Sequence, residues 1–225
     1  MLVFEDRAAL AAQLAKQTEA ALAARIKEQG TAMLAVSGGS TPGLLFQTLS
    51  AADLDWSRVT ITLVDERWVP EGDPRSNAAL VRRTLLVNQA AAARFIPLYN
   101  GAKTPESGLA AMQGLFAEQP LPFAAVILGM GEDGHTASFF PGGDHLDAAL
   151  NPPPGRLLES MNAPGAGEPR ITFTLPVLVQ ADFMALHIEG ERKRAVLGVS
   201  QKPGRDEDLP VRAVLRHAPE IFWCS

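Results

Sequence analysis

The segment FAAVILGMGEDGHTASFFPG, residues 123–142, joins a short apolar run to a loop of glycines, an acidic pair and a histidine. The run at 123–128 is typical of a buried strand. A strand that ends in glycines and then presents Asp133 and His135 is a recurrent way to place reactive groups at the carboxyl edge of a sheet. Glycine there lets the backbone turn tightly and approach a ligand. The segment therefore predicts a functional site on an α/β sheet.

The glycines of this loop have a second interpretation. Gly129, Gly131 and Gly134 match the GxGxxG pattern of a dinucleotide-binding loop. Such a loop must open a long helix, and the residues at 139–142, Phe-Phe-Pro-Gly, leave little room for one. The acidic pair at 132–133 would also lie beside the pyrophosphate. We therefore reject a dinucleotide site.

An acid/base element fits the loop better. Histidine transfers protons near neutral pH, and a nearby carboxylate such as Asp133 can orient the ring of His135. The alternative is a loop histidine without a task. A metal site formed with Asp144, His145 and Asp147 is disfavoured, because the spacing fits no familiar zinc pattern.

Composition narrows the class of protein. The chain has 225 residues with 47% hydrophobic and 20% charged residues, which is ordinary for a soluble globular domain. Its net charge of −5 without a basic run argues against nucleic-acid and anionic-membrane partners. No apolar stretch approaches the roughly 18 residues of a membrane span. Glu5 and Asp6 lie where a signal peptide carries positive charge, and Cys224 is the only cysteine. We expect a cytoplasmic enzyme.

Apolar periodicity predicts helices and strands in alternation. Helices are expected at 6–29, 43–49, 77–86, from 104, at 191–199 and at 211–216. Strands are expected at 32–36, 59–64, 95–99, 123–128, 156–161, 171–174, 183–188 and 221–223. This alternation implies a layered α/β fold with a largely parallel sheet. No linker separates two cores, so residues 1–225 are expected to form a single domain.

The loop after the strand at 32–36 is a candidate phosphate site. Gly38, Gly39, Ser40 and Thr41 precede a predicted helix, where backbone N–H groups and the helix dipole favour an anion. The pattern of a nucleotide-binding P-loop is missing, so a single phosphoryl group fits better than a triphosphate. The alternative is an ordinary turn in which Thr41 caps the helix.

Charged residues at other strand ends are further candidates. Asp65 and Glu66 could serve as base or ligand, and Arg67 could bind a phosphate or carboxylate in bidentate fashion. A strand-end salt bridge is the alternative. Arg170 and Lys193 also lie at the ends of predicted elements, where they are either recruited by a sheet-edge site or are ordinary surface charges.

Two negative expectations complete the survey. His187 lies inside an apolar strand and is expected to be a hydrogen-bonded core residue rather than a ligand. No GxSxG sequence is present, so a serine nucleophile is unsupported.

Taken together, these segments resemble the 6-phosphogluconolactonases, within the wider sugar-phosphate group that includes the glucosamine-6-phosphate deaminases. The resemblance covers nearly the whole chain, in order. It rests on SGGSTP at 37–42, VDERWVP at 64–70, SN at 76–77, GMGEDGHTASFFPG at 129–142 and RITFTLPVL at 170–178. It implies a three-layer α/β domain, Rossmann-like in topology, with a mostly parallel sheet and helices on both faces.

The resemblance also implies a reaction. The substrate would be 6-phospho-D-glucono-1,5-lactone, hydrolysed to 6-phosphogluconate in the oxidative pentose phosphate pathway. His135 would act as general base on water, and Asp133 would orient it. Arg67 would stabilise the substrate or the developing oxyanion. Alternatively Arg67 binds the phosphate, and backbone amides at 129–131 stabilise the oxyanion.

The resemblance further implies how the substrate is held. No metal or organic cofactor is expected, because a lactone carbonyl is already a reactive electrophile. The partner would be this small sugar-phosphate lactone, and the protein a monomer or weak homo-oligomer without nucleic-acid or membrane partners. The expected substrate and phosphate contacts are Gly38, Gly39, Ser40, Thr41, Asp65, Gly131, Arg170 and Lys193.

Two other functions are considered. Deaminases of this group carry DEY where this chain has DER at 65–67, and a glutamate five residues after the loop histidine, where this chain has Phe140. A phenyl ring cannot relay a proton, so deamination lacks a required group. A non-catalytic sugar-phosphate sensor would usually carry a DNA-binding module, and the sequence contains no helix-turn-helix segment or basic patch.

Overall fold

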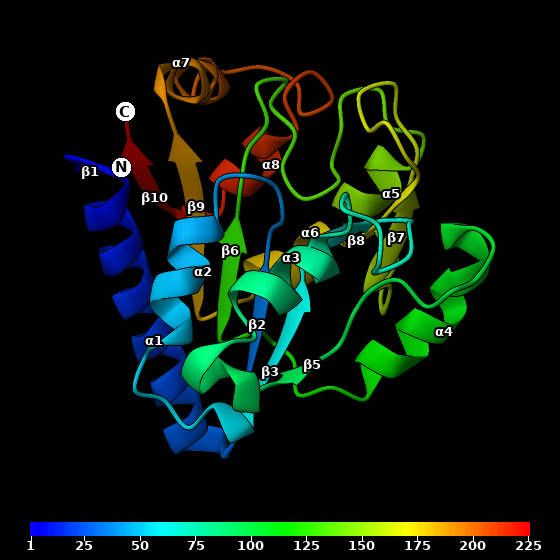
Figure 1. Cartoon of the computed structure of the whole chain (residues 1–225). Coiled ribbons are helices and arrows are strands. Elements are labelled where there is room, and N and C mark those ends of the chain that lie inside the picture. The colour runs from blue at the N-terminus through cyan, green and yellow to red at the C-terminus, as the bar shows by residue number, and fades with distance from the viewer.

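A seven-stranded parallel sheet forms the centre of the protein in a computed structural model that describes residues 1–225 (Figure 1). The strand order is β1-β10-β9-β6-β2-β3-β5, and every neighbouring pair is parallel. All strands therefore end at the same edge. The strands are β1 (Leu2–Phe4), β2 (Ala32–Val36), β3 (Val59–Leu63), β5 (Arg94–Phe95), β6 (Ala125–Leu128), β9 (Phe183–Glu189) and β10 (Glu220–Cys224).

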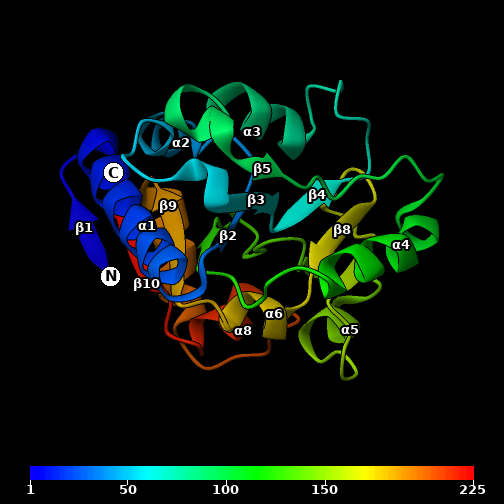
Figure 2. The same ribbon diagram turned by 90° about the horizontal axis from the view of Figure 1, so that it is seen from below.

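Helices cover both faces of this sheet, which confirms the expected three-layer α/β fold (Figure 2). They are α1 (Arg7–Gln29), α2 (Gly43–Ser50), α3 (Asn77–Thr84), α4 (Pro105–Ala117), α5 (Leu146–Leu150), α6 (Leu175–Val179), α7 (Glu191–Ser200) and α8 (Val211–Leu215). Two 3₁₀ helices lie at Trp56–Arg58 and Asn88–Ala92. Helices α1, α2 and α3 lie on one side of the sheet, and α6 and α8 on the other. None of the helices has both the length and the apolar character needed to cross a membrane.

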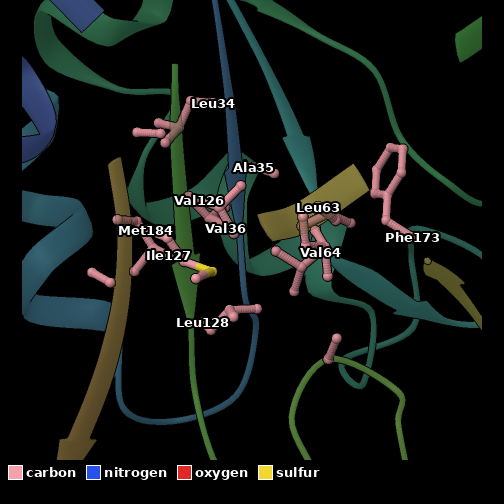
Figure 3. Packing of buried hydrophobic residues seen from close by; sticks show 14 of the residues in the cluster. Leu34, Ala35, Val36, Leu63, Val64, Val126, Ile127, Leu128, Phe173 and Met184 are labelled. Atoms are coloured by element: carbon pink, nitrogen blue, oxygen red, sulfur yellow. The ribbon is translucent and has the colours of Figure 1, made fainter. Parts of the chain in front are cut away.

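The central strands are apolar because helices bury both of their faces. Every residue of β2 and of β6 is buried. Figure 3 shows Val36, Val126 and Leu128 within the packed interior where these two strands run side by side. One cluster of 59 buried hydrophobic residues extends from the sheet to the helices on each face. This core gives the edge of the sheet a rigid base.

A second, three-stranded antiparallel sheet stands beside the first. It consists of β4 (Asp65–Arg67), β8 (Arg170–Phe173) and β7 (Leu158–Met161), in the order β4-β8-β7. Val64 joins the two sheets: its N–H donates to Val36 O at 3.0 Å, and its carbonyl accepts from Phe173 N at 3.0 Å. The sequence predicts the strands at 156–161 and 171–174 without assigning them to a separate sheet.

Several predicted boundaries differ from the structure. The strand expected at 95–99 is reduced to Arg94–Phe95, and β1, α5 and α6 are too short to produce a periodic signal. Asp6 and Gly30 cap α1 as expected, since Asp6 accepts from Ala9 N and Gly30 has φ +85°. Thr41 does not cap α2, because the N-cap is Pro42. The hydroxyl of Thr41 is therefore free for another contact.

Buried Glu66 fixes β4 against the start of α3. Its carboxylate accepts hydrogen bonds from the backbone N–H groups of Arg67, Asn77 and Ala78 at 2.7–2.8 Å, and from the hydroxyl of Ser76 at 3.0 Å. Burial raises the pKa of Glu66 above its usual value, although the three backbone donors oppose this shift. The carboxylate satisfies orphan donors at a helix N-terminus, which are costly when buried without partners.

We expect Glu66→Gln to lower the free energy of unfolding by about 1–3 kcal/mol, because an amide nitrogen would face one pair of buried donors. Chemical denaturation measures this change. The control is Glu71→Gln, which removes a surface pair with Arg82 worth at most about 1 kcal/mol. Equal costs for the two substitutions would contradict the anchoring role of Glu66.

Candidate active site

One cleft of about 200 Å³ opens where β2, β6 and β9 end. Its walls come from the loops that follow these strands, from β4 and β8, and from the first turn of α7. The predicted residues that line it are Gly38, Gly39, Ser40, Thr41, Asp65, Arg67, Gly131, His135, Arg170 and Lys193. The remaining lining residues are Ser37, Pro42, Asn77, Ile127, Leu128, Gly129, Met130, Ala137 and His187.

Asp133 lies behind His135 and bonds to its ring. The Oδ1 atom of Asp133 is 2.6 Å from Nδ1 of His135 and also accepts from the His135 backbone N–H at 3.2 Å. Burial acts to raise the pKa of Asp133, but the hydrogen bond and the charge of His135 outweigh it and hold this pKa below its usual value. A carboxylate at Nδ1 leaves Nε2 as the nitrogen available for proton transfer.

Two glycines give the His135 loop its shape. A Cβ at Gly131 would collide with the imidazole of His135 and with the carboxylate of Asp133. Gly134 has φ +79°, and a Cβ there would lie 2.5 Å from the side chain of Leu209. The carbonyl of Gly134 accepts from Val211 N at 2.9 Å, which ties the loop to α8. The next helix along the chain is α5, which begins at residue 146 and has only five residues. No long helix therefore begins at the glycines.

Phe140 packs between the histidine and an arginine. Its ring stacks on His135 with centroids 4.3 Å apart, and the guanidinium of Arg170 lies 5.3 Å from the same ring. Phe140 is almost fully buried. The phenyl ring therefore supports the plane of the imidazole.

Strand alternation separates the roles of the three residues in β4. Asp65 and Arg67 point toward the cleft, whereas Glu66 points to the start of α3. Asp65 accepts from the hydroxyl of Ser138 at 2.5 Å and lies 3.6 Å from the guanidinium of Arg170. Asp65 therefore forms a salt bridge at this strand end, and its partner is Arg170 of the neighbouring strand β8.

The two arginines of the cleft are cross-strand neighbours, Arg67 opposite Arg170. Each has a buried Nε atom without a hydrogen-bond partner. Desolvation lowers the pKa of Arg170, and the charge of Asp65 opposes this shift. Arg67 donates to the carbonyl of Arg75, and Arg170 donates to the carbonyl of Ala166 at 2.6 Å. Two neighbouring guanidinium groups, each with an unpaired N–H, suit an anionic guest even though Asp65 partly compensates Arg170.

The loop at 38–41 meets the first turn of α7. The ammonium of Lys193 donates to the hydroxyl of Thr41 at 3.3 Å. Desolvation lowers the pKa of Lys193, while the charges of Glu189 and Glu132 act to raise it. A Cβ at Gly38 would collide with the amide of Asn77, so only glycine fits there. The loop can present backbone N–H groups to a phosphate beside a cation.

Sequence reasoning left nine lining residues out of the predicted site, and Asn77 and His187 are two of them. Asn77 donates to Asp65 O at 3.0 Å, and its buried Oδ1 has no partner. The only sequence feature that pointed to Asn77 was its place in the segment SN at 76–77, which is part of the family resemblance. His187 is buried and hydrogen-bonded as expected, but it also lines the cleft. Nowhere in the structure do three or more His, Cys, Asp or Glu side chains form a group that could hold a metal ion.

Comparison with known proteins identifies relatives over the whole chain. Residues 5–223 match the family model described as glucosamine-6-phosphate isomerases/6-phosphogluconolactonase. The 6-phosphogluconolactonase of Rhizobium meliloti is 51% identical over 99% of this chain and 97% of its own length. That of Mesorhizobium japonicum is 49% identical over 98% and 93%, respectively.

Solved structures give the same result. The crystal structure of a 6-phosphogluconolactonase from Shewanella baltica superposes with a TM-score of 0.95 at 39% identity, and the match covers 99% of this chain and 96% of that one. The fold, the cleft and these relatives agree, and the chain belongs to the glucosamine-6-phosphate isomerase/6-phosphogluconolactonase family.

Proposed function

We propose that the protein hydrolyses 6-phospho-D-glucono-1,5-lactone to 6-phosphogluconate in the oxidative pentose phosphate pathway. The observation that carries this proposal is the Asp133–His135 pair, 2.6 Å apart, in the same cleft as the glycine loop and Lys193. A base and a group of cationic and backbone donors in one cleft suit a phosphorylated substrate whose reacting carbon is not the one that carries the phosphate. Relatives named 6-phosphogluconolactonase, one of them 51% identical, support the same activity.

In the proposed mechanism His135 takes a proton from a water molecule that attacks the lactone carbonyl carbon. A bond forms between the water oxygen and this carbon, and the carbonyl oxygen becomes an oxyanion. The tetrahedral intermediate then collapses, the bond to the ring oxygen breaks, and His135 returns the proton to that oxygen. Asp133 holds the ring and stabilises its charged form between the two steps.

Positive charge in the cleft has two tasks in this proposal. Lys193, Arg170 and the loop at 38–41 hold the phosphate, while Arg67 stabilises the oxyanion. A preorganised oxyanion donor is worth about 3–4 kcal/mol. Asp65 keeps Arg170 in place through their ion pair of 3.6 Å. A lactone carbonyl needs no further activation by a cofactor.

The setting of the reaction is part of the proposal. Residues 1–225 act as one domain that binds a small sugar-phosphate lactone. We place the reaction in the cytoplasm and expect a monomer or a weak homo-oligomer. Gel filtration with light scattering tests the oligomeric state.

The activity is tested by generating the lactone with glucose-6-phosphate dehydrogenase and trapping the remainder with hydroxylamine. The protein is expected to accelerate lactone decay above the spontaneous rate. Decay at the spontaneous rate would refute the proposal. Ammonia release from glucosamine 6-phosphate would instead identify a deaminase, which Phe140 beside His135 argues against.

Removing the proposed base should affect the chemical step. His135→Ala is expected to lower kcat by about 10²–10⁴-fold with little change in KM, because general base catalysis contributes a factor of this size. Steady-state kinetics with the same lactone measure both constants. Exposed His217 provides the control, since His217→Ala should leave them unchanged. A rise in KM without a fall in kcat would assign His135 to binding.

The charge of Asp133 should set the acid limb of the pH profile. Since the pKa of Asp133 is held below its usual value, this carboxylate stays ionised throughout the neutral range. Asp133→Asn keeps its shape but removes the charge that stabilises the imidazolium of His135. We therefore expect the acid limb of kcat/KM to move to lower pH. An unshifted limb together with a lower kcat would leave Asp133 only an orienting role.

The two arginines should separate in kinetics. Arg170→Ala is expected mainly to raise KM through loss of phosphate binding. Arg67→Ala is expected to lower kcat by about 10²–10³-fold, as removal of an oxyanion donor does. Arg83→Ala, at an exposed position of α3, is the control. The reverse pattern would mean that Arg67 binds the phosphate and Arg170 serves the oxyanion.

A further inference from the structure

A second histidine–carboxylate pair lies at the carboxyl end of β9. The Nε2 atom of His187 is 3.1 Å from Oε1 of Glu189, two residues on and therefore on the same face of the strand. The other oxygen of Glu189 pairs with Nε of Arg7, in the first turn of α1, at 2.7 Å. The side chains of His187 and Glu189 are only 4% and 8% exposed. Arg7 therefore holds the carboxylate of Glu189, and Glu189 in turn holds the ring of His187.

The free nitrogen of this histidine is the important atom. Nδ1 of His187 makes no hydrogen bond within the protein, yet it is not among the buried polar atoms that lack a partner. The residue also lines the cleft. A ring nitrogen that is reached from the cleft and left unbonded there is available to a ligand.

Glu189 is an anionic partner for the other ring nitrogen of His187. Burial acts to raise the pKa of Glu189, but the hydrogen bond from His187 and the charges of His187, Arg7 and Lys193 hold it below its usual value. Glu189 is therefore an ionised acceptor, and Nε2 of His187 keeps its proton. When Nδ1 is also protonated, the ring donates to Glu189 on one side and into the cleft on the other.

The position of the ring identifies what it would contact. The strand that carries His187 turns at Gly190 into α7, whose first turn carries Lys193. Lys193 in turn contacts Thr41 of the glycine loop at 3.3 Å. His187, Lys193 and Thr41 line the same cleft, and Lys193 is close enough to Glu189 to act on its charge, so an anion bound by Lys193 and Thr41 would lie near the His187 ring.

We propose that His187 binds the phosphoryl group of the substrate through Nδ1, with Glu189 fixing the ring from behind. This inference rests on the proposed function for the identity of the substrate. It adds a neighbouring donor to Lys193 and the glycine loop. It also gives Glu189 and Arg7 a purpose: they position His187 without reaching the ligand.

Two amide substitutions test the contact. The amide nitrogen of asparagine occupies roughly the place of Nδ1, and that of glutamine the place of Nε2. His187→Gln therefore keeps the bond to Glu189 and loses the donor to the ligand, whereas His187→Asn does the opposite. Inorganic phosphate and 6-phosphogluconate, titrated by calorimetry, are the probes. His217→Asn is the control, and thermal melts verify that each variant is folded.

His187→Gln should weaken binding of both probes by about 10- to 100-fold, as expected for loss of a hydrogen bond to a charged group. His187→Asn should retain more of the affinity. If His187→Asn loses as much affinity for the probes as His187→Gln, or more, the proposal is overturned. That result would show that His187 serves only to hold Glu189.

Kinetics separate this inference from the proposed function. His187→Gln should raise KM for the phosphorylated lactone with little change in kcat, and leave hydrolysis of unphosphorylated glucono-1,5-lactone unaffected. An equal effect on both lactones would overturn the phosphoryl contact. If the protein hydrolyses neither lactone, the proposed function fails, and the phosphate titrations still decide whether His187 binds an anion.

Discussion

Because neighbouring strands of the large sheet all run parallel, the loops that leave β2, β6 and β9 are forced to one edge. The site depends on this constraint, since its glycine loop at 38–41, its proposed base and Lys193 follow three different strands. The hydroxyl of Ser37 joins two of these loops: it donates to Ile127 O and accepts from Gly129 N, both at 3.0 Å. A rigid apolar sheet thus holds together polar groups that are far apart in sequence.

The smaller sheet contributes the two arginines of the cleft. At Val64 the chain leaves the large sheet and pairs with β8, so that Arg67 and Arg170 face each other across two antiparallel strands. Alternation along β4 then divides a uniform-looking polar triplet: Asp65 and Arg67 face the cleft, while Glu66 turns inward and binds the donors at the start of α3. Glu66 thus holds β4 in place, while Asp65 and Arg67 on either side of it line the cleft.

The two histidine–carboxylate pairs show the limit of local sequence. In both, the carboxylate lies two residues from the histidine, Asp133 before His135 and Glu189 after His187. The first stands in a glycine loop after a buried strand, a place typical of reactive groups, and so it is predicted as a site. The second stands in an apolar strand, where a histidine reads as part of the core. Its contact with the cleft depends on how far the strand extends, which periodicity does not reveal.

The sequence by itself determined the α/β fold, most of the long helices and the buried strands, because apolar spacing and capping residues act within a few positions of each other. It also indicated the glycine loop, His135 with Asp133, and Arg170 and Lys193 at element ends. The tertiary structure alone decided that β4, β7 and β8 form a separate sheet, that Glu66 is an anchor, and that His187 reaches the cleft. The pairing of β4 with β8 joins segments about a hundred residues apart, and the roles of Glu66 and His187 depend on which face of a strand meets the start of α3 or the cleft. No local pattern carries that information.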